Sequence, residues 1–331
     1  MILNRALIVI AAALACVCSV QAQPSAIQQL QNSQWRAFTA PPELRAGTNA
    51  PETYQGENAD IGPQRILRVN QRPAGLRPDI FDLFFDSQIF YTDNANYAGA
   101  NERIGSMVFL NTAQIALAPE PMNLGPGKIA PAIGFSSQWY TYERTAMSPL
   151  DFNAQTAFLN TRYLLGHWQF NLSASYSRLL SQDSGAETYQ EFLPALGLQR
   201  VFVLRDNLAL VVGNAVEYHF TTVPPVPGNR RDINDHLDDT LYLTVNWQAT
   251  GKLVIQPFYR LQYAYYPNDT LMLSSRTDWL NSAGLNVIYS FNRYASVRAF
   301  FCYNTKTSND EFTSHYDELN GGIGVSFNLR F

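Results

Sequence analysis

From Ile80 onward, the chain is a succession of segments in which apolar and polar side chains alternate. Residues 208–220 illustrate the pattern, with Leu208 and Val212 on one face and Glu217 and His219 on the other. A period of two is the period of a β-strand, whose successive side chains point to opposite faces. Twelve such segments lie at residues 80–92, 104–118, 128–142, 151–164, 167–180, 189–204, 207–221, 239–248, 252–266, 279–291, 294–305 and 318–331. The sequence therefore predicts an all-β chain of about twelve strands, with ten or fourteen as alternatives because strand boundaries are soft.

The connections between these segments alternate in length. Tight turns fall at 165–166, 205–206, 249–251 and 292–293, and longer polar stretches fall at 143–150, 181–188, 222–238, 267–278 and 306–317. Short turns at one end and long loops at the other are typical of membrane-spanning antiparallel up-and-down β-barrels. An even number of strands also closes without an unpaired edge. Residues 119–127, rich in Pro and Gly, are the exception, because they are long for a connection at the short-turn end.

Composition separates such a barrel from a soluble sandwich. Only 15% of residues are charged while 13% are aromatic. The polar faces carry mainly Asn, Gln, Ser, Gly and Thr, where a water-facing sheet would carry Lys and Glu. Aromatic residues gather near strand ends, as in the interfacial girdles of barrels: Trp139, Tyr142, Tyr218, Phe220, Tyr263, Tyr265, Trp279 and Tyr303 at one end, and Trp168, Trp247, Tyr289, Phe291 and Phe331 at the other. The alternative is a soluble β-protein with ordinary strand aromatics. The formal charge of −4 gives no basic surplus, which argues against a nucleic-acid partner.

The last thirteen residues, 319–331, carry a resemblance to a known class. Apolar residues occupy alternate positions up to Phe327, Leu329 and Phe331, and the sequence ends on that Phe. This resembles the closing strand of Gram-negative outer-membrane β-barrels of porin-like architecture, without naming a specific family. The resemblance implies that Phe327, Leu329 and Phe331 form an assembly signal read by the barrel-assembly machinery. It also implies an outer-membrane location, contact with outer-membrane lipid and lipopolysaccharide, and a periplasmic N-terminus.

The first 78 residues are predicted to lie outside the barrel. Residues 1–22 read as a secretory signal peptide, with Arg5 before an apolar stretch and small residues at Val20 and Ala22. An imperfect lipobox ending at Cys16 offers a lipoprotein start as an alternative. Residues 23–78, rich in Pro, Gln and Asn, are predicted to be an irregular periplasmic segment. They could be a plug, a partner contact or a simple leader to the barrel of residues 79–331.

Charged residues on the predicted inward faces are the candidates for function. They are Asp82, Asp86, Arg162, Glu217, His219, Arg260, Arg298 and Arg330. Opposed acidic and basic walls would make an aqueous pore, and the chain a passive or weakly selective channel for small solutes. The same charges could instead form ion pairs that brace a closed interior, since an unpaired buried charge is costly. The chain would then be a structural or adhesin-type barrel.

An enzyme is the less favoured class. Outer-membrane phospholipases resemble Ser-His-Asn enzymes in which His and Ser lie two residues apart on a strand before Asn-Gly. Here Thr221 follows His219 at that spacing and no Asn-Gly follows. No zinc-ligand spacing appears either. We therefore predict no catalytic residues, no cofactor and no metal site.

An acidic stretch lies in the predicted loop 222–238 and at its end: Asp232, Asp235, Asp238 and Asp239. Carboxylates close together could bind calcium, or bridge to lipopolysaccharide through divalent ions. The alternative, which we favour, is ordinary solvated loop charge.

Overall fold

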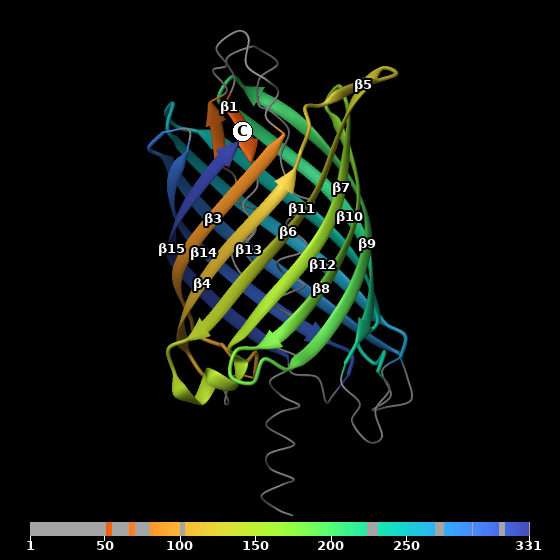
Figure 1. Cartoon of the computed structure of the whole chain (residues 1–331), viewed down its shortest axis with the longest axis vertical. Coiled ribbons are helices and arrows are strands. Elements are labelled where there is room, and N and C mark those ends of the chain that lie inside the picture. Colours follow the sequence, from red (N-terminus) through yellow and green to blue (C-terminus); the bar gives the residue numbers. More distant parts are fainter. Residues whose placement is uncertain are drawn as a thin grey trace, which may run out of the picture.

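The chain forms a closed antiparallel β-barrel. The computed structural model describes residues 51–54, 66–69, 80–99, 103–223, 231–268, 275–292, 294–310 and 315–330. Twelve long strands are each hydrogen-bonded to their neighbours along the chain, and the last, β15, pairs with the first, β3 (Figure 1). They are β3 (Phe81–Thr92), β4 (Ser106–Leu117), β6 (Gly127–Tyr142), β7 (Phe152–Leu165), β8 (Trp168–Ser181), β9 (Glu187–Arg205), β10 (Leu208–Thr222), β11 (His236–Gln248), β12 (Leu253–Tyr266), β13 (Arg276–Ser290), β14 (Ala295–Ser308) and β15 (Tyr316–Arg330). The predicted number of strands, their antiparallel pairing and the closure of the barrel are confirmed.

The predicted strands coincide with the observed ones to within three residues at either end. The largest differences lie where strands meet the long connections. There β11 begins at His236, β13 begins at Arg276 and β14 continues to Ser308. In each case charged residues that the sequence pattern assigns to loops are paired into the sheet instead.

Short and long connections lie at opposite ends of the barrel, as predicted (Figure 1). The turns at 166–167, 206–207, 249–252 and 291–294 lie at the end that also holds the C-terminus, which we call the turn end. The longer connections, including the 3-10 helix η2 (Thr145–Leu150), lie at the loop end. The exceptional stretch before β6 contains a short strand, β5 (Met122–Leu124), which pairs with the first residues of β6 and lengthens that hairpin.

The outward face of the barrel is apolar on every strand. Along β3 the exposed Phe81 and Phe85 alternate with the buried Asp82, Phe84 and Asp86. One exposed apolar residue from each strand shows that this surface runs around the whole barrel: Phe85, Phe109, Ile133, Leu159, Leu172, Leu196, Val216, Leu241, Tyr259, Leu285, Phe301 and Ile323. A continuous apolar belt of this extent is stable against lipid and not against water. The barrel therefore spans a membrane. Among the described residues, no helix has the length and apolar character needed to cross a bilayer.

Aromatic residues border the apolar belt at both ends. Trp139, Trp279 and Tyr303 are exposed near the loop end, and Trp168 and Trp247 near the turn end. The prediction is wrong for Tyr142, which is only 4% exposed and faces the interior. Its position differs from that of Trp139 by an odd number, so the two side chains cannot share a face of one strand.

Two short strands precede the barrel. The strands β1 (Pro51–Tyr54) and β2 (Ile66–Val69) form an antiparallel pair within the segment predicted to be irregular. Figure 1 places β1 at the end of the barrel that holds the C-terminus. The predicted signal peptide, residues 1–22, and the terminal Phe331 lie outside the described residues. The other members of the predicted assembly signal, Phe327 and Leu329, lie on the exposed outer face of β15.

Candidate functional site

Five titratable side chains converge inside the barrel near the loop end, and we call them the inner cluster. They are Glu191 on β9, Glu217 and His219 on β10, and His236 and Asp238 on β11. All five side chains are at most 2% exposed. Adjacent strands bring them together, because inward-facing positions on neighbouring strands lie side by side.

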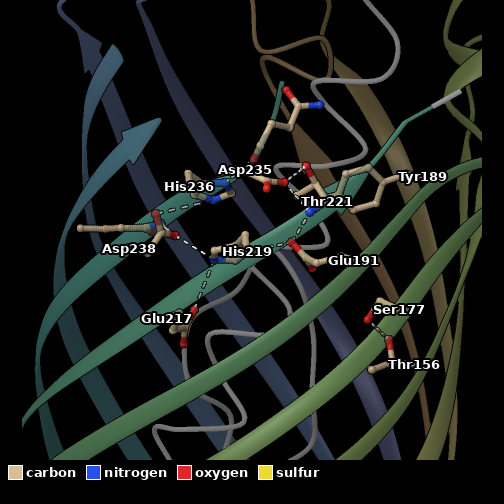
Figure 2. A network of polar contacts seen from close by, with 12 residues as sticks. Thr156, Ser177, Tyr189, Glu191, Glu217, His219, Thr221, Asp235, His236 and Asp238 are labelled. Carbon is tan, nitrogen blue, oxygen red and sulfur yellow. Dashed lines mark hydrogen bonds and ion pairs between the residues drawn. The ribbon is translucent and has the colours of Figure 1, made fainter. Parts of the chain in front are cut away.

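His219 is the centre of the inner cluster (Figure 2). Its Nδ1 lies 2.6 Å from Glu191 Oε1, which also accepts a 2.9 Å hydrogen bond from the hydroxyl of Tyr189. Its Nε2 lies 3.3 Å from Asp238 Oδ2 and 3.8 Å from Glu217 Oε2. Three carboxylates therefore surround one imidazole.

His236 lies parallel to His219. The two ring centroids are 3.9 Å apart with an interplanar angle of 8°. The ring of Tyr266 stacks on the other side of His236 at 4.5 Å, and the guanidinium of Arg276 lies 3.7 Å from the centroid of Tyr266. The Nδ1 of His236 lies 2.6 Å from the backbone oxygen of Asn234. Aromatic packing and this hydrogen bond fix the orientation of the ring.

Buried ionic contacts continue around the wall. Lys306 Nζ and Arg276 Nε lie 2.9 and 3.3 Å from Asp278 Oδ2. Glu318 accepts hydrogen bonds from Thr92 at 2.8 Å and from Asn304 at 3.1 Å. Most of these charges thus have partners within the wall of the barrel.

A second, smaller group bridges the closure between β15 and β3. Arg298 Nη2 lies 2.7 Å from Asp86 Oδ2. Gln88 donates to Oδ2 at 2.6 Å, and Ser326 donates to Oδ1 at 2.5 Å. The acidic residue of β3 and the basic residue of β14 are therefore in direct contact, and they do not form opposed walls.

The remaining predicted residues are more scattered. Asp82 is buried on β3 and its backbone register partner on β15 is Arg330, whose side chain lies outside the described part. Arg260 is buried on β12 and donates to Ser282 at 3.2 Å. Arg162 is half-buried on β7, three strands away from β10. The structure brings together Glu217 with His219, and Asp86 with Arg298.

The sequence pattern missed Glu191 and His236 as members of a site, and it considered Asp238 only as a possible calcium ligand in an external loop. His236 and Asp238 were expected in a solvated external loop, and that is wrong, because β11 begins at His236 and both side chains face the interior. The even-numbered residues of β11, including Thr240 and Tyr242, face the interior. Extending that alternation back by two residues at a time would have placed Asp238 and His236 on the inward face. Glu191 lies within a predicted strand. Its inward neighbours Leu193 and Ala195 are apolar, so the local pattern does not mark Glu191 as part of a polar site.

Several buried polar atoms along the interior have no hydrogen-bond partner among the residues that the structure describes. They occur near the turn end at Gln169 Oε1 and Asn246 Nδ2, and at mid-height at Gln88 Oε1 and Thr112 Oγ1. Near the loop end the side chain of Asn320 is in the same state. Buried polar groups in folded proteins are nearly always paired with protein or with water.

One charge outside the membrane-spanning part is fixed at the rim of the loop end. Arg103 donates to Asp317 Oδ1 at 2.6 Å and lies 3.8 Å from Asp93. The hydrogen bond that Arg103 donates to Asp317 raises the pKa of Arg103 above its ordinary value. This contact connects the segment after β3 to the start of β15.

Comparison with known proteins gives similarity only at the level of solved structures. No family model and no curated protein matches the chain. The COG4313 outer membrane channel from Pseudomonas putida F1 is 10% identical, covering 78% of this chain and 100% of that chain with a TM-score of 0.47. The NanC porin is 12% identical, covering 74% of this chain and 100% of that chain with a TM-score of 0.40. A KdgM porin in complex with disordered oligogalacturonate is 10% identical, covering 74% and 98% with a TM-score of 0.39. At these values no function transfers from those proteins to this chain.

Proposed function

We propose that this protein is an outer-membrane channel through which small polar solutes pass passively, with weak selectivity. The observation that carries the proposal is the polar lining of the interior, where side chains such as Gln169, Thr112 and Asn320 face inward from the turn end to the loop end. In membrane barrels a polar interior holds either water or a plug. Among the described residues, several of these inward polar atoms have no hydrogen-bond partner, and water in the interior would supply one.

The size of the barrel limits what such a path carries. Twelve strands enclose more space than the filled eight-stranded barrels and less than the wide porins. The inner cluster lies near the loop end with all five side chains at most 2% exposed. The proposed substrates are therefore small molecules and not folded proteins. The neighbouring charges of Glu217, Asp238 and Arg260 would set a weak preference among ions.

The same proposal places the barrel in the outer membrane with its turn end and N-terminus in the periplasm. Short turns on one side and a C-terminal strand that closes on β3 support that orientation. Lipopolysaccharide would then contact the loop end, and the barrel-assembly machinery would read Phe327, Leu329 and Phe331. Residues 1–22 would be removed on export, and residues 23–78 would remain in the periplasm at the turn end.

We do not propose an enzymatic activity. His219 faces the interior, whereas membrane lipids contact the opposite face of β10. Thr221, which stands where a phospholipase-like serine would be expected, donates its hydroxyl to Asp235 at 2.8 Å. Neither side chain is placed to attack a lipid ester.

Conductance of the refolded full-length protein in a planar bilayer tests the channel. We expect stable ohmic steps, because the interior is lined with polar side chains that would be hydrated. In a Cys302→Ala background, Thr112→Cys should lose conductance with a charged, water-soluble thiol reagent, because residue 112 faces the interior. The matched control is Asn111→Cys, whose side chain is exposed on the outer face of the same strand and should give no block.

The outcome that contradicts the channel is the absence of any conductance from protein that has folded into a barrel. If the full-length protein and a variant lacking residues 23–78 both fail to conduct while migrating as heat-modifiable barrels, the interior charges brace a closed structural barrel. Steps that appear only in the shortened variant would make residues 23–78 a plug of the channel.

A further inference from the structure

We propose that His219, His236 and Asp238 bind a divalent transition-metal ion such as Zn²⁺ inside the barrel, with Glu217 as the fourth ligand. The ligand set is built by two adjacent strands. In the β10–β11 register, His219 is the direct partner of His236, and Glu217 is the direct partner of Asp238. These are successive inward pairs, so four ligand side chains occupy the corners of one small patch.

Both imidazoles present the correct nitrogen to this patch. The backbone oxygen of Asn234 only accepts hydrogen bonds, so the Nδ1 of His236 must carry a proton. Glu191 holds Nδ1 of His219 in the same way. Each neutral ring then has its lone pair on Nε2. Because the two rings are stacked in parallel, one of them must turn about its Cβ–Cγ bond before both nitrogens bind the same ion. A metal-binding histidine that donates its other nitrogen to a carboxylate or a backbone carbonyl is the usual second layer of such sites.

Two separations, each to a different oxygen of Asp238, fall in the range expected around a tetrahedral metal. Donors at about 2.0–2.2 Å from zinc lie roughly 3.3–3.6 Å from one another. His219 Nε2 lies 3.3 Å from Asp238 Oδ2, and His236 Nε2 lies 3.6 Å from Asp238 Oδ1. The ligand atoms of these three residues all lie within 4.8 Å of one another. Glu217 Oε2 lies 3.8 Å from His219 Nε2, close enough to complete the set after a small rotation.

Unused hydrogen-bonding capacity is concentrated at the same point. Among the described residues, the buried atoms His219 Nε2, Asp238 Oδ1 and Glu217 Oε1 have no hydrogen-bond partner. Gln262 donates to the other oxygen of Asp238. A divalent cation would give His219 Nε2 and Asp238 Oδ1 a partner and would offset the three carboxylates that surround His219.

The chemistry of the ligands selects the metal. Calcium and magnesium prefer sites made of oxygen alone, whereas imidazole nitrogen suits zinc, copper, nickel and iron. Two imidazoles and two carboxylates without a thiolate favour Zn²⁺, Co²⁺ or Ni²⁺ over Cu⁺. This site is independent of whether the barrel conducts.

Metal binding by the refolded full-length protein tests the proposal. The protein is refolded in detergent, freed of metal, and titrated with Co²⁺ as an optical probe and with Zn²⁺ against a coloured chelator. Because the site is buried, metal is also added during refolding in a parallel sample. We expect one equivalent of Co²⁺ with a visible absorption spectrum typical of four-coordinate geometry, displaced by one equivalent of Zn²⁺.

Conservative variants assign the ligands. His236→Gln and Asp238→Asn should each weaken Zn²⁺ binding at least ~10-fold, and Glu191→Gln should weaken it by about 10–100-fold as an outer-layer partner. Glu217→Gln should alter the Co²⁺ spectrum if Glu217 is the fourth ligand. The control is His167→Gln, which removes an exposed histidine from a turn and should change nothing. Heat-modifiable migration is recorded for every variant, so that loss of binding is not confused with loss of the barrel.

Three outcomes would overturn the site. The first is no saturable binding by the folded protein, whether metal is added during or after refolding. The second is unchanged affinity in both His236→Gln and Asp238→Asn. The third is a loss of binding in His167→Gln, which would place the metal at the surface.

Discussion

At the scale of single residues, the interior of this barrel is organised by direct contacts between charges. Asp86 illustrates this, because Arg298, Gln88 and Ser326 all donate to its two oxygens. The pair is almost fully buried, with Asp86 at 3% and Arg298 at 4% exposure. Removing one member of a buried pair costs more than removing both, because the remaining charge keeps its desolvation penalty.

Arg298→Met is therefore predicted to lower the free energy of unfolding by about 3–5 kcal/mol. The double variant Asp86→Asn with Arg298→Met should recover much of that loss, because no unpaired charge remains. Urea unfolding of the refolded protein, followed by heat-modifiable migration, measures both. A double variant as unstable as the sum of the two single variants would show that the two side chains do not act as a pair.

At the scale of the strand, the closure of the barrel depends on a close approach of backbones. Gly322 on β15 is the register partner of Phe90 on β3. A Cβ at position 322 would lie 2.6 Å from the Cα of Phe90 and closer still to the backbone oxygen of Ile89. Backbone atoms cannot move aside without disturbing the hydrogen bonds that close the sheet.

Gly322→Ala is thus predicted to destabilise the barrel by about 1–3 kcal/mol, as an overpacked site does. The neighbouring Gly321→Ala is the control, because a Cβ there meets nothing closer than the oxygen of Phe300 at 3.6 Å. The midpoint of heat-modifiable migration should fall for the first variant and stay unchanged for the second. Equal midpoints would mean that β15 and β3 are not held as closely as the register indicates.

Strands also show how far the sequence determines this fold. Alternation is dictated locally, so every barrel strand could be placed from its own residues, with the largest errors at the loop end. There the inward side chains are charged, and His236, Asp278 and Lys306 resemble loop residues when each strand is considered alone. The interior supplies their partners from other strands, and those contacts are not visible in a local pattern.

At the scale of the whole molecule, the candidate site depends on relations that the sequence does not display. Inward charges such as Glu217 and His219 could be predicted from the parity of their strand. The pairing of His219 with His236 could not, because it depends on the register across the β10–β11 connection. Glu191 joins them from β9 through a hydrogen bond between residues 28 positions apart. A site made from three strands requires the register of two pairings at once.

The orientation of the barrel is the property of the whole molecule most directly open to test. With the turn end in the periplasm, the β10–β11 connection faces the outside and the turn at 249–252 faces the periplasm. In a Cys302→Ala background, Arg231→Cys, at an exposed position of that connection, should react with a bulky membrane-impermeant maleimide on intact cells. Gly251→Cys should react only after the outer membrane is permeabilised, and its added Cβ meets nothing within 4 Å, so the turn should tolerate it. The parent without an added cysteine provides the background. Labelling in the opposite order would show that the barrel has the opposite orientation in the membrane. Residues 23–78 would then lie at the cell surface, where they could not act as a periplasmic plug.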